Sequence, residues 1–327
     1  MVLDQMLLEG LVSTIIPVFN RPVLVREAVA SVLAQTHRPI EIIIVDDGST
    51  DPTPAVLAEL AGTNPDTITV RRVPNGGPGA AREAGRQLVR GEFIQYLDSD
   101  DLLLPRKFEW QVAGLRAHPE CGVSYGKTLY SKVGETPPDV AWKRTGERIE
   151  AMFPSMLESR WWDTSTPLYR RSVVEAAGPW SNLSREEDWE YDCHIARQGI
   201  RLHYCREFVS KTRLHQGEML SRSGLTAAAL RDRATAHNLI YGHASAAGIK
   251  CDSPEMKHFA RELFLLARQC GAASLPKDAQ ELFELARQAS GPVRARGLDF
   301  VAYQYASSLF GWTLTGRAAC KLDAIRP

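Results

Sequence analysis

Three carboxylates stand within four positions of the chain, at Asp98, Asp100 and Asp101. They follow the largely apolar run 93–97, which predicts a buried strand, and the carboxyl end of such a strand faces the ligand crevice of an open α/β sheet. Carboxylates this close repel one another unless a cation lies between them, and Mg²⁺ or Mn²⁺ prefers oxygen ligands. The stretch therefore predicts a metal site for an anionic substrate such as a diphosphate. The alternative is a helix N-cap, because Asp and Ser side chains accept hydrogen bonds from free amides there.

A second acidic segment, residues 46–51, follows the β-branched run 40–45. At the end of a strand, Asp46 can accept hydrogen bonds from a ribose or a base, and Gly48 permits close approach of the backbone. The polar residues after Gly48 can instead cap the next helix. The segment predicts a contact to a nucleotide through Asp46.

Residues 75–85 form a glycine-rich loop that runs into a predicted helix. The loop is not a Gly-x-Gly-x-x-Gly fingerprint, because Arg82 stands at the last glycine position counted from Gly77 and Gly79, and because that fingerprint belongs after the first strand. The pattern places Arg82 in the first turn of the helix, where the helix dipole disfavours a cation. We therefore expect this side chain to face a nucleotide.

Adjacent aromatic and acidic residues mark the second half of the chain. Of Trp161 and Trp162, we expect one to pack inward and the other either to pack as well or to stack on a sugar. Glu187 and Asp188 open a predicted helix, where acids suit the helix dipole. Asp188 can also remain ionised there and act as a general base.

Arg213 and His215 follow a further predicted strand. A lone histidine is commonly structural, but an Arg-x-His segment at a strand end can supply one phosphate contact and one metal ligand. Arg213, Trp162 and Glu187 are the candidates for contacts to the diphosphate or the acceptor.

Strands and helices alternate through the first two thirds of the chain, which predicts an α/β fold with a parallel sheet and right-handed crossovers. From about residue 225 strand signals vanish, and helices are expected at 226–247, 254–270, 276–289 and 297–316. The predicted domains are therefore residues 1–224 and residues 225–327. The aromatic stripe 298–312 either packs on its own domain, forms a homodimer contact, or lies on a membrane surface.

The composition indicates that a ligand is bound by a local site rather than attracted by the overall charge of the chain. Lysine plus arginine equals aspartate plus glutamate at 39 each, so no overall field points to nucleic acid. The 6 cysteines are scattered, without the clusters of a zinc site, which suggests a reducing compartment. The first ten residues lack the pattern of a signal peptide, and no apolar stretch approaches the ~18 to 20 residues of a membrane span. We expect a cytoplasmic protein, with a peripheral position on the inner face of the membrane as an option.

Five segments match one enzyme family in both order and spacing. They are Ile16-Pro17-Val18-Phe19-Asn20, Val45 to Asp51, Asn75-Gly76-Gly77 with Ala81-Arg82, Leu97 to Asp101, and Glu187-Asp188-Trp189. The series resembles the family 2 glycosyltransferases of the GT-A fold over roughly residues 11–222. This resemblance implies a Rossmann-like, mostly parallel sheet flanked by helices, with an α-helical C-terminal extension.

The resemblance also implies roles for individual residues. Asp46 would hold the base and ribose, Arg82 would contact the nucleotide, and the remaining contacts would come from Pro17, Val18, Phe19, Asp47, Asp98 and Ser99. This chain has Glu83 where the family usually has asparagine, which puts the contact by Arg82 in question. Asp98 and Asp100 match the family's DxD motif. Asp100, together with His215, would bind Mg²⁺ or Mn²⁺, and Asp188 would be the general base.

The leading hypothesis is an inverting, metal-dependent glycosyltransferase. It would move a sugar from a nucleoside diphosphate sugar, UDP- or dTDP-linked, to a hydroxyl of a glycan or lipid-linked acceptor, in polysaccharide or glycoconjugate synthesis. One alternative is a nucleotidyltransferase, which would carry a lysine-bearing, glycine-rich loop where residues 17–20 stand. The other is a catalytically silent nucleotide- or glycan-binding subunit, which would have no use for a base at Asp188.

Overall fold

The computed structural model describes residues 7–214 and 226–323, which form two compact units. Of the described residues, unit 1 contains 7–152, 161–183 and 200–214, and unit 2 contains 153–160, 184–199 and 226–323. The short segments 153–160 and 184–199 thus group with the C-terminal helices. The assignment of separate domains to residues 1–224 and 225–327 stays a prediction.

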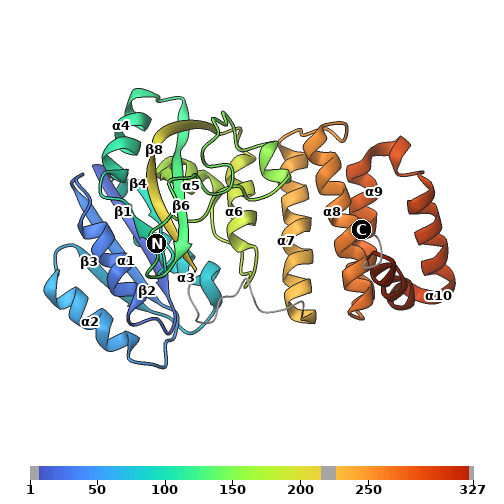
Figure 1. Cartoon of the computed structure of the whole chain (residues 1–327), viewed down its shortest axis with the longest axis horizontal. Coiled ribbons are helices and arrows are strands. Elements are labelled where there is room, and N and C mark those ends of the chain that lie inside the picture. The colour runs from blue at the N-terminus through green and yellow to red at the C-terminus, as the bar shows by residue number, and fades with distance from the viewer. Residues whose placement is uncertain (1–6, 215–225, 324–327) are drawn as a thin grey trace. The chain divides into compact units, whose positions relative to one another are not determined.

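Within the described residues, unit 1 is built on one eight-stranded sheet in the order β3-β2-β1-β4-β7-β6-β8-β5 (Figure 1). The strands are β1 Leu8–Val18, β2 Ile40–Asp46, β3 Ile68–Arg72, β4 Gly91–Tyr96, β5 Leu102–Leu103, β6 Cys121–Lys132, β7 Leu168–Arg170 and β8 Arg201–Leu214. Strands β1 to β4 run parallel, as the alternation of strands and helices predicts. In the other half β7 pairs antiparallel with β4 and β6, and β5 pairs antiparallel with β8.

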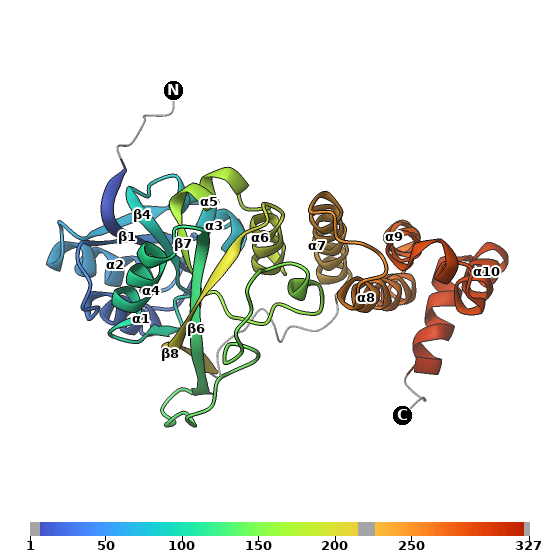
Figure 2. The same ribbon diagram turned by 90° about the horizontal axis from the view of Figure 1, so that it is seen from above.

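Helices cover both faces of the parallel half of the sheet (Figure 2). Helix α1 (Leu24–Leu33) joins the buried cluster that contains Ile16, whereas α3 (Gly77–Arg86) packs on Ile15. Neighbouring residues of a strand point to opposite faces, so these two helices lie on opposite sides. A Cβ at Gly85 would lie 2.5 Å from Cγ2 of Ile15, so the glycine permits the close approach of α3 to β1. Unit 1 also contains α2 Thr53–Thr63, α4 Lys107–Ala117 and α5 Arg171–Ala177.

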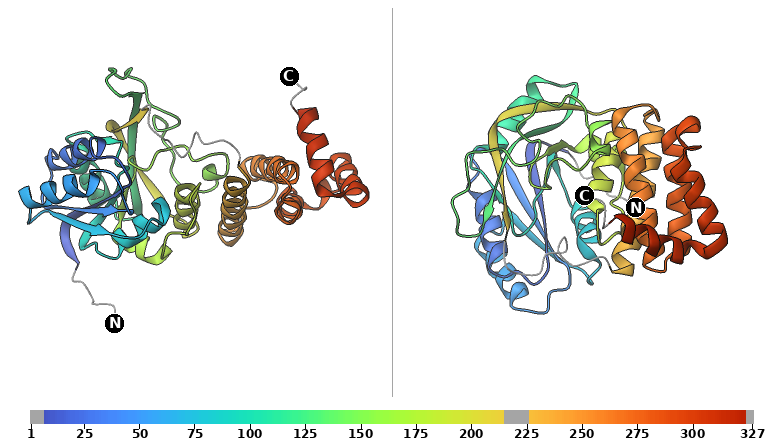
Figure 3. Two further views of the ribbon diagram at one scale, coloured as in Figure 1. Left: turned by 90° about the horizontal axis from the view of Figure 1, so that it is seen from below. Right: turned by 45° about the vertical axis from the view of Figure 1, so that its right-hand side comes forward.

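Unit 2 is helical (Figure 3). Its elements are the 3-10 helix η1 Ser155–Leu157 and the α-helices α6 Glu187–Ala196, α7 Ala227–Ala246, α8 Pro254–Ala272, α9 Pro276–Arg294 and α10 Leu298–Asp323. The side chains of Thr226 and Ser253 accept hydrogen bonds from the first turns of α7 and α8, which explains where these helices begin. The predicted C-terminal helices are thereby confirmed.

Two of the C-terminal helices kink at a glycine with positive φ. Gly291, at φ 75°, precedes Pro292, and α9 continues past this kink beyond the predicted end at residue 289. Gly311, at φ 78°, interrupts α10. Phe300 and Tyr303 of α10 are buried against the aromatic core of unit 2, whereas other apolar side chains of this helix are exposed. None of the described helices combines the length and apolarity that a membrane span requires.

Candidate functional site

The carboxyl edge of β1, β2 and β4 carries the acidic residues predicted for the site in unit 1. Because these three strands are parallel neighbours, their last residues lie at one edge of the sheet. Strand β2 ends in Asp46, and Asp98 follows β4 by two positions. The topology therefore brings the ends of the strands that precede Asp46 and Asp98 to the same edge of the sheet.

Arg82 meets Asp98 at this edge. The Nη2 atom of Arg82 lies 2.7 Å from Oδ1 of Asp98, and the guanidinium carbon lies 4.9 Å from the ring centroid of Trp180. The side chain of Arg82 is buried, whereas that of Asp98 is about one third exposed. Because α3 begins at Gly77, Arg82 lies in its second turn, so the expectation of an arginine in the first turn was wrong. Arg82 is held by Asp98 and by the face of Trp180.

Arg21 is a residue of the site that the sequence analysis did not select. Its Nη1 atom lies 2.9 Å from Oδ2 of Asp100 and 3.5 Å from Oγ of Ser99. The segment Asn20-Arg21-Pro22 carries no motif that singles out this arginine. In the fold this segment follows β1, which brings the guanidinium to the carboxyl edge.

Asp101 is the most deeply buried carboxylate of the acidic segment. It accepts hydrogen bonds from the backbone N of Arg213 at 3.0 Å, from Oγ of Ser165 at 3.2 Å and from Oγ1 of Thr212 at 3.3 Å. Burial, followed by repulsion from the other carboxylates of the cluster, raises the pKa of Asp101 well above its ordinary value. Asp101 thus joins the acidic segment to β8.

The predicted phosphate contact, Arg213, is buried within the same network. Its Nε donates to the carbonyl oxygen of Asp100 at 2.5 Å, and its Nη1 forms an ion pair with Glu27. Among the described residues, its Nη2 atom is buried and has no hydrogen-bond acceptor. Arg213 therefore holds the backbone of the acidic segment and keeps one donor for a further acceptor. His215, predicted as a metal ligand, lies outside the described residues.

The carboxylates of Asp46 and Asp47 accept hydrogen bonds from backbone amides near the end of β2 and at the start of α3. Oδ1 of Asp46 accepts from the backbone N of Ser49 at 2.9 Å. Both oxygens of Asp47 accept backbone hydrogen bonds at the start of α3, from Gly76 at 2.8 Å and Gly77 at 2.9 Å. Burial is the main cause of the raised pKa of Asp47. Asp47 thus caps α3, a structural contact that the sequence analysis did not predict.

The residues predicted to flank the nucleotide at the end of β1 differ in exposure. Pro17 and Val18 are the last residues of the strand, and the carbonyl oxygen of Val18 accepts a hydrogen bond from the backbone N of Asp47 at 2.9 Å. Phe19 is 42% exposed. Of these three residues, Phe19 is the one that offers an aromatic face at the surface.

Asp188 belongs to unit 2, in the first turn of α6. Its Oδ2 atom lies 2.7 Å from Nη1 of Arg160, whose Nε binds Asp192 at 2.7 Å. Glu187 beside it is buried. The guanidinium of Arg160 fixes the orientation of the Asp188 carboxylate, which remains about one third exposed.

The comparison with known families gives the assignment. Residues 13–174 match the family model described as Glycosyl transferase family 2. The chain belongs to the family 2 glycosyltransferases. An uncharacterized glycosyltransferase of Rickettsia felis is 36% identical over 157 residues, which are 47% of this chain and 25% of that protein. Another, of Nostoc sp., is 31% identical over 210 residues, or 63% of this chain and 62% of that protein.

Solved structures agree with the fold of this glycosyltransferase. TarS of S. aureus, residues 1–349 in complex with UDP-GlcNAc, has a TM-score of 0.71 at 18% identity, covering 95% of this chain and 91% of that one. The mannosyltransferase PcManGT from Pyrobaculum calidifontis, in complex with GDP-Man and Mn²⁺, has a TM-score of 0.51 at 19% identity, covering 96% and 88%. The predicted family, fold class and transferase class are confirmed. This chain spans only 25% to 62% of the length of the two relatives above, so the activity of the whole protein is a matter of proposal.

The acidic edge of the glycosyltransferase has the chemistry of a divalent-metal site. Mg²⁺ is commonly held by one or two carboxylates together with substrate phosphates, so few protein ligands suffice. Asp98 and Asp100 supply oxygen atoms. Burial and the neighbouring carboxylates raise the pKa of Asp101, which means that negative charge is disfavoured here unless a cation balances it. The donor set therefore fits Mg²⁺ or Mn²⁺, with Asp100 and Asp98 as the described residues that would hold it.

The expectation for the two adjacent tryptophans requires a correction. The side chains of Trp161 and Trp162 are 1% and 0% exposed. Tyr125 packs against both rings, with centroid distances of 5.1 and 5.7 Å. Because this aromatic cluster encloses both indoles, Trp162 presents no face on which an acceptor sugar could stack.

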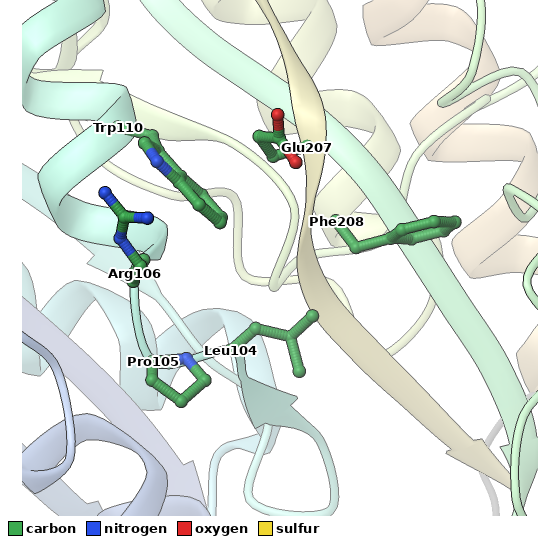
Figure 4. Close-up of a pocket in the computed structure, with 6 residues that line it drawn as sticks. All are labelled: Leu104, Pro105, Arg106, Trp110, Glu207 and Phe208. Carbon is green, nitrogen blue, oxygen red and sulfur yellow. The ribbon is translucent and has the colours of Figure 1, made fainter.

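A shallow hollow of the glycosyltransferase lies between α4, the segment before it, and β8 (Figure 4). Its lining residues are Leu104, Pro105, Arg106, Trp110, Glu207 and Phe208. None of the predicted site residues contributes to it. We therefore locate the candidate site from the convergence of charged side chains rather than from this hollow.

Proposed function

We propose that this protein is an inverting, metal-dependent glycosyltransferase that moves a sugar from a nucleoside diphosphate sugar to an acceptor hydroxyl. The observation that carries the proposal is the pairing of acidic and basic side chains at one edge of the sheet. Asp98 pairs with Arg82 and Asp100 pairs with Arg21. A diphosphate with its divalent metal presents both signs of charge, so it can exchange partners with these pairs without leaving a charge unpaired.

The proposed donor is a UDP- or dTDP-linked sugar. Asp46 is the last residue of β2, where it would accept hydrogen bonds from the base and ribose, with Asp47, Ser99 and the backbone of Pro17, Val18 and Phe19 beside it. Support comes from the complexes of structurally similar enzymes, which hold UDP-GlcNAc in TarS and GDP-Man in PcManGT. Because those two donors carry different bases, GDP-linked sugars are included in the donor screen below.

The chemistry is a single displacement at the anomeric carbon. Asp188 would accept the proton of the acceptor hydroxyl as that oxygen attacks, and the bond to the diphosphate oxygen breaks on the opposite face of the sugar. Arg160 orients the Asp188 carboxylate for this transfer. Arg82 and Arg21 would bind phosphate oxygens, where negative charge builds up. So would Nη2 of Arg213, which finds no acceptor within residues 7–214 and 226–323. Glu187 would support the acceptor.

A bound Mg²⁺ or Mn²⁺, held by Asp100 and His215, would neutralise negative charge on the leaving diphosphate. Asp98 would orient the ribose or share the metal. We assign the transfer reaction to residues 1–224 and a supporting role to the helical residues 225–327. The acceptor would be a glycan or a lipid-linked saccharide.

The test is a donor screen. Purified protein is incubated with Mn²⁺ and, one at a time, with UDP-, dTDP- and GDP-linked sugars, and the nucleoside diphosphate released is measured. We expect slow hydrolysis of one donor, faster with its acceptor and abolished by EDTA. A protein that binds nucleoside diphosphates but releases none from any donor would instead be a silent binding subunit.

A further inference from the structure

Helices α6 and α7 of unit 2 bring one carboxylate and two imidazoles together. Glu190 and His194 stand one turn apart on α6, and His243 lies on α7. One ligand atom of each residue lies within 4.8 Å of the other two. Among the residues that the structure describes, no other three His, Cys, Asp or Glu side chains meet in this way. These residues have no part in the proposed transfer reaction.

Glu190 gives an independent indication of a ligand. It is 2% exposed, and its Oε1 atom lies 2.8 Å from Nε2 of His243. Its other oxygen, Oε2, is buried and finds no hydrogen-bond donor within the described part of the chain. A buried carboxylate oxygen without a partner is costly, and a cation is the partner that satisfies it best.

We propose that Glu190, His194 and His243 bind one Zn²⁺ ion. Two imidazole nitrogens and one carboxylate oxygen form a ligand set that suits Zn²⁺, with water in the fourth position. Hard Mg²⁺ prefers sites made of oxygen alone. The two proposed metal sites therefore differ in chemistry. The site at the acidic edge of unit 1 has oxygen ligands and the single predicted His215. The site in unit 2 has two nitrogen ligands and one oxygen ligand.

The geometry requires the ligand side chains to move. Zinc bonds of about 2.0 to 2.2 Å place tetrahedral ligand atoms about 3.3 Å apart. Oε1 of Glu190 and Nε2 of His243 are 2.8 Å apart and must separate slightly. The rings of His194 and His243 are stacked, with centroids 4.5 Å apart, so His194 must move further. His194 is partly exposed, so it can turn out of the stack and direct a nitrogen at the ion.

A zinc ion at this site would fasten α6 to α7. Since α6 begins with Glu187 and Asp188, the ion would steady the helix that presents the proposed base. The zinc site does not depend on that assignment, because its ligands and its test do not involve sugar transfer.

The test is zinc binding by the untagged full-length protein, measured by equilibrium dialysis in excess Mg²⁺, which occupies oxygen-rich sites. We expect one tightly bound Zn²⁺ per chain, and a loss of affinity of at least about tenfold in His194→Gln and in His243→Gln. His118→Gln is the matched control, because His118 also stacks on a histidine, His203 at 5.3 Å, and lies 3.3 Å from Oε1 of Glu120. It should bind zinc like the unaltered protein.

His194→Gln decides the outcome, because this partly exposed side chain can be replaced without opening the core, and circular dichroism checks its fold. Zinc affinity unchanged in His194→Gln would overturn the proposal. So would the absence of tight binding in the unaltered protein. Loss of zinc in Asp100→Asn together with its retention in His194→Gln would place the ion at the acidic edge instead, and would also refute the site.

Discussion

The Nη1 atom of Arg21 lies 2.9 Å from Oδ2 of Asp100, so the carboxylate proposed to bind the metal is held by a guanidinium. Both side chains are largely shielded from solvent, and Ser99 lies beside them. A cation that binds Asp100 must therefore compete with Arg21. Once a metal ion has replaced Arg21 as the partner of Asp100, the guanidinium of Arg21 can bind a phosphate.

Replacing Arg21 should therefore separate metal affinity from nucleotide affinity. In Arg21→Ala, the affinity for Mn²⁺ alone should rise by up to about fivefold, because the loss of a competing ion pair is worth up to ~1 kcal/mol. The affinity for a nucleoside diphosphate with Mn²⁺ should fall. Both are measured by calorimetric titration, with Arg26→Ala, which breaks an exposed pair with Glu59, as the control. Weaker binding of Mn²⁺ alone by Arg21→Ala would contradict this account.

The buried carboxylate of Asp101 should shape the pH dependence of stability. Its pKa in the folded protein is raised, mainly by burial, so the folded state gains a proton before the unfolded state does. This contribution to the free energy of unfolding is least favourable at high pH. It improves as the pH falls through the folded pKa towards about 3.9, the unfolded value.

Asp101→Asn removes this titration while keeping an acceptor for the backbone N of Arg213. We expect the variant to match or exceed the stability of the unaltered protein at about pH 8 and to lose that advantage by about pH 5. Urea unfolding at several pH values without added metal measures the difference. A variant that is less stable than the parent at the higher pH, with a gap that narrows as the pH falls, would show that the carboxylate is favourably charged in the folded protein.

Gly48 should be required by both its conformation and its surroundings. It has a φ of +75°, and an added Cβ would lie 2.8 Å from the backbone N of Asn75. Gly134 has a φ of +84° but nothing within 4 Å, so Gly134→Ala measures the cost of conformation alone. Gly48→Ala should lower the free energy of unfolding by about 1 to 3 kcal/mol, and by more than the control does. Equal losses in the two variants would mean that the turn relaxes around the methyl group.

Asp188→Asn should separate binding from turnover. The variant keeps a neighbour for Arg160 but cannot accept a proton, so kcat should fall by about 10² to 10⁴-fold while donor affinity stays within about twofold. The measurement is donor turnover alongside calorimetric donor binding. Asp192→Asn, which alters the other partner of Arg160, is the comparison and should retain more activity. Turnover by Asp188→Asn within about tenfold of normal would remove this residue from the role of base.

The fold follows from the sequence where one local pattern decides the structure. Strands β1, β2 and β4 are short apolar runs that end in acid or in a turn, and their parallel pairing brings Asp46 and Asp98 to one edge. Helices α7 and α8 begin at a Thr and a Ser cap, and α8 and α9 begin at a proline, which are also local signals.

What could not be predicted depends on contacts between distant parts of the chain. The cap of α3 by Asp47 joins residues 29 and 30 positions apart, and the hydrogen bond from Arg213 to Asp101 spans 112 positions. Nothing in the local sequence around Arg21 shows that it reaches Asp100. Likewise, the burial of Trp162 results from Tyr125 on β6, a strand that no pattern near the tryptophans reveals.

The most direct test of the proposed function is the binding of UDP, dTDP and GDP to the unaltered protein and to Asp100→Asn, each with Mn²⁺ and with EDTA. The account predicts that at least one nucleotide binds the unaltered protein at least about tenfold more tightly with Mn²⁺, and that Asp100→Asn loses this gain while staying folded. Equal affinity with Mn²⁺ and with EDTA, or a full metal effect in Asp100→Asn, would contradict it.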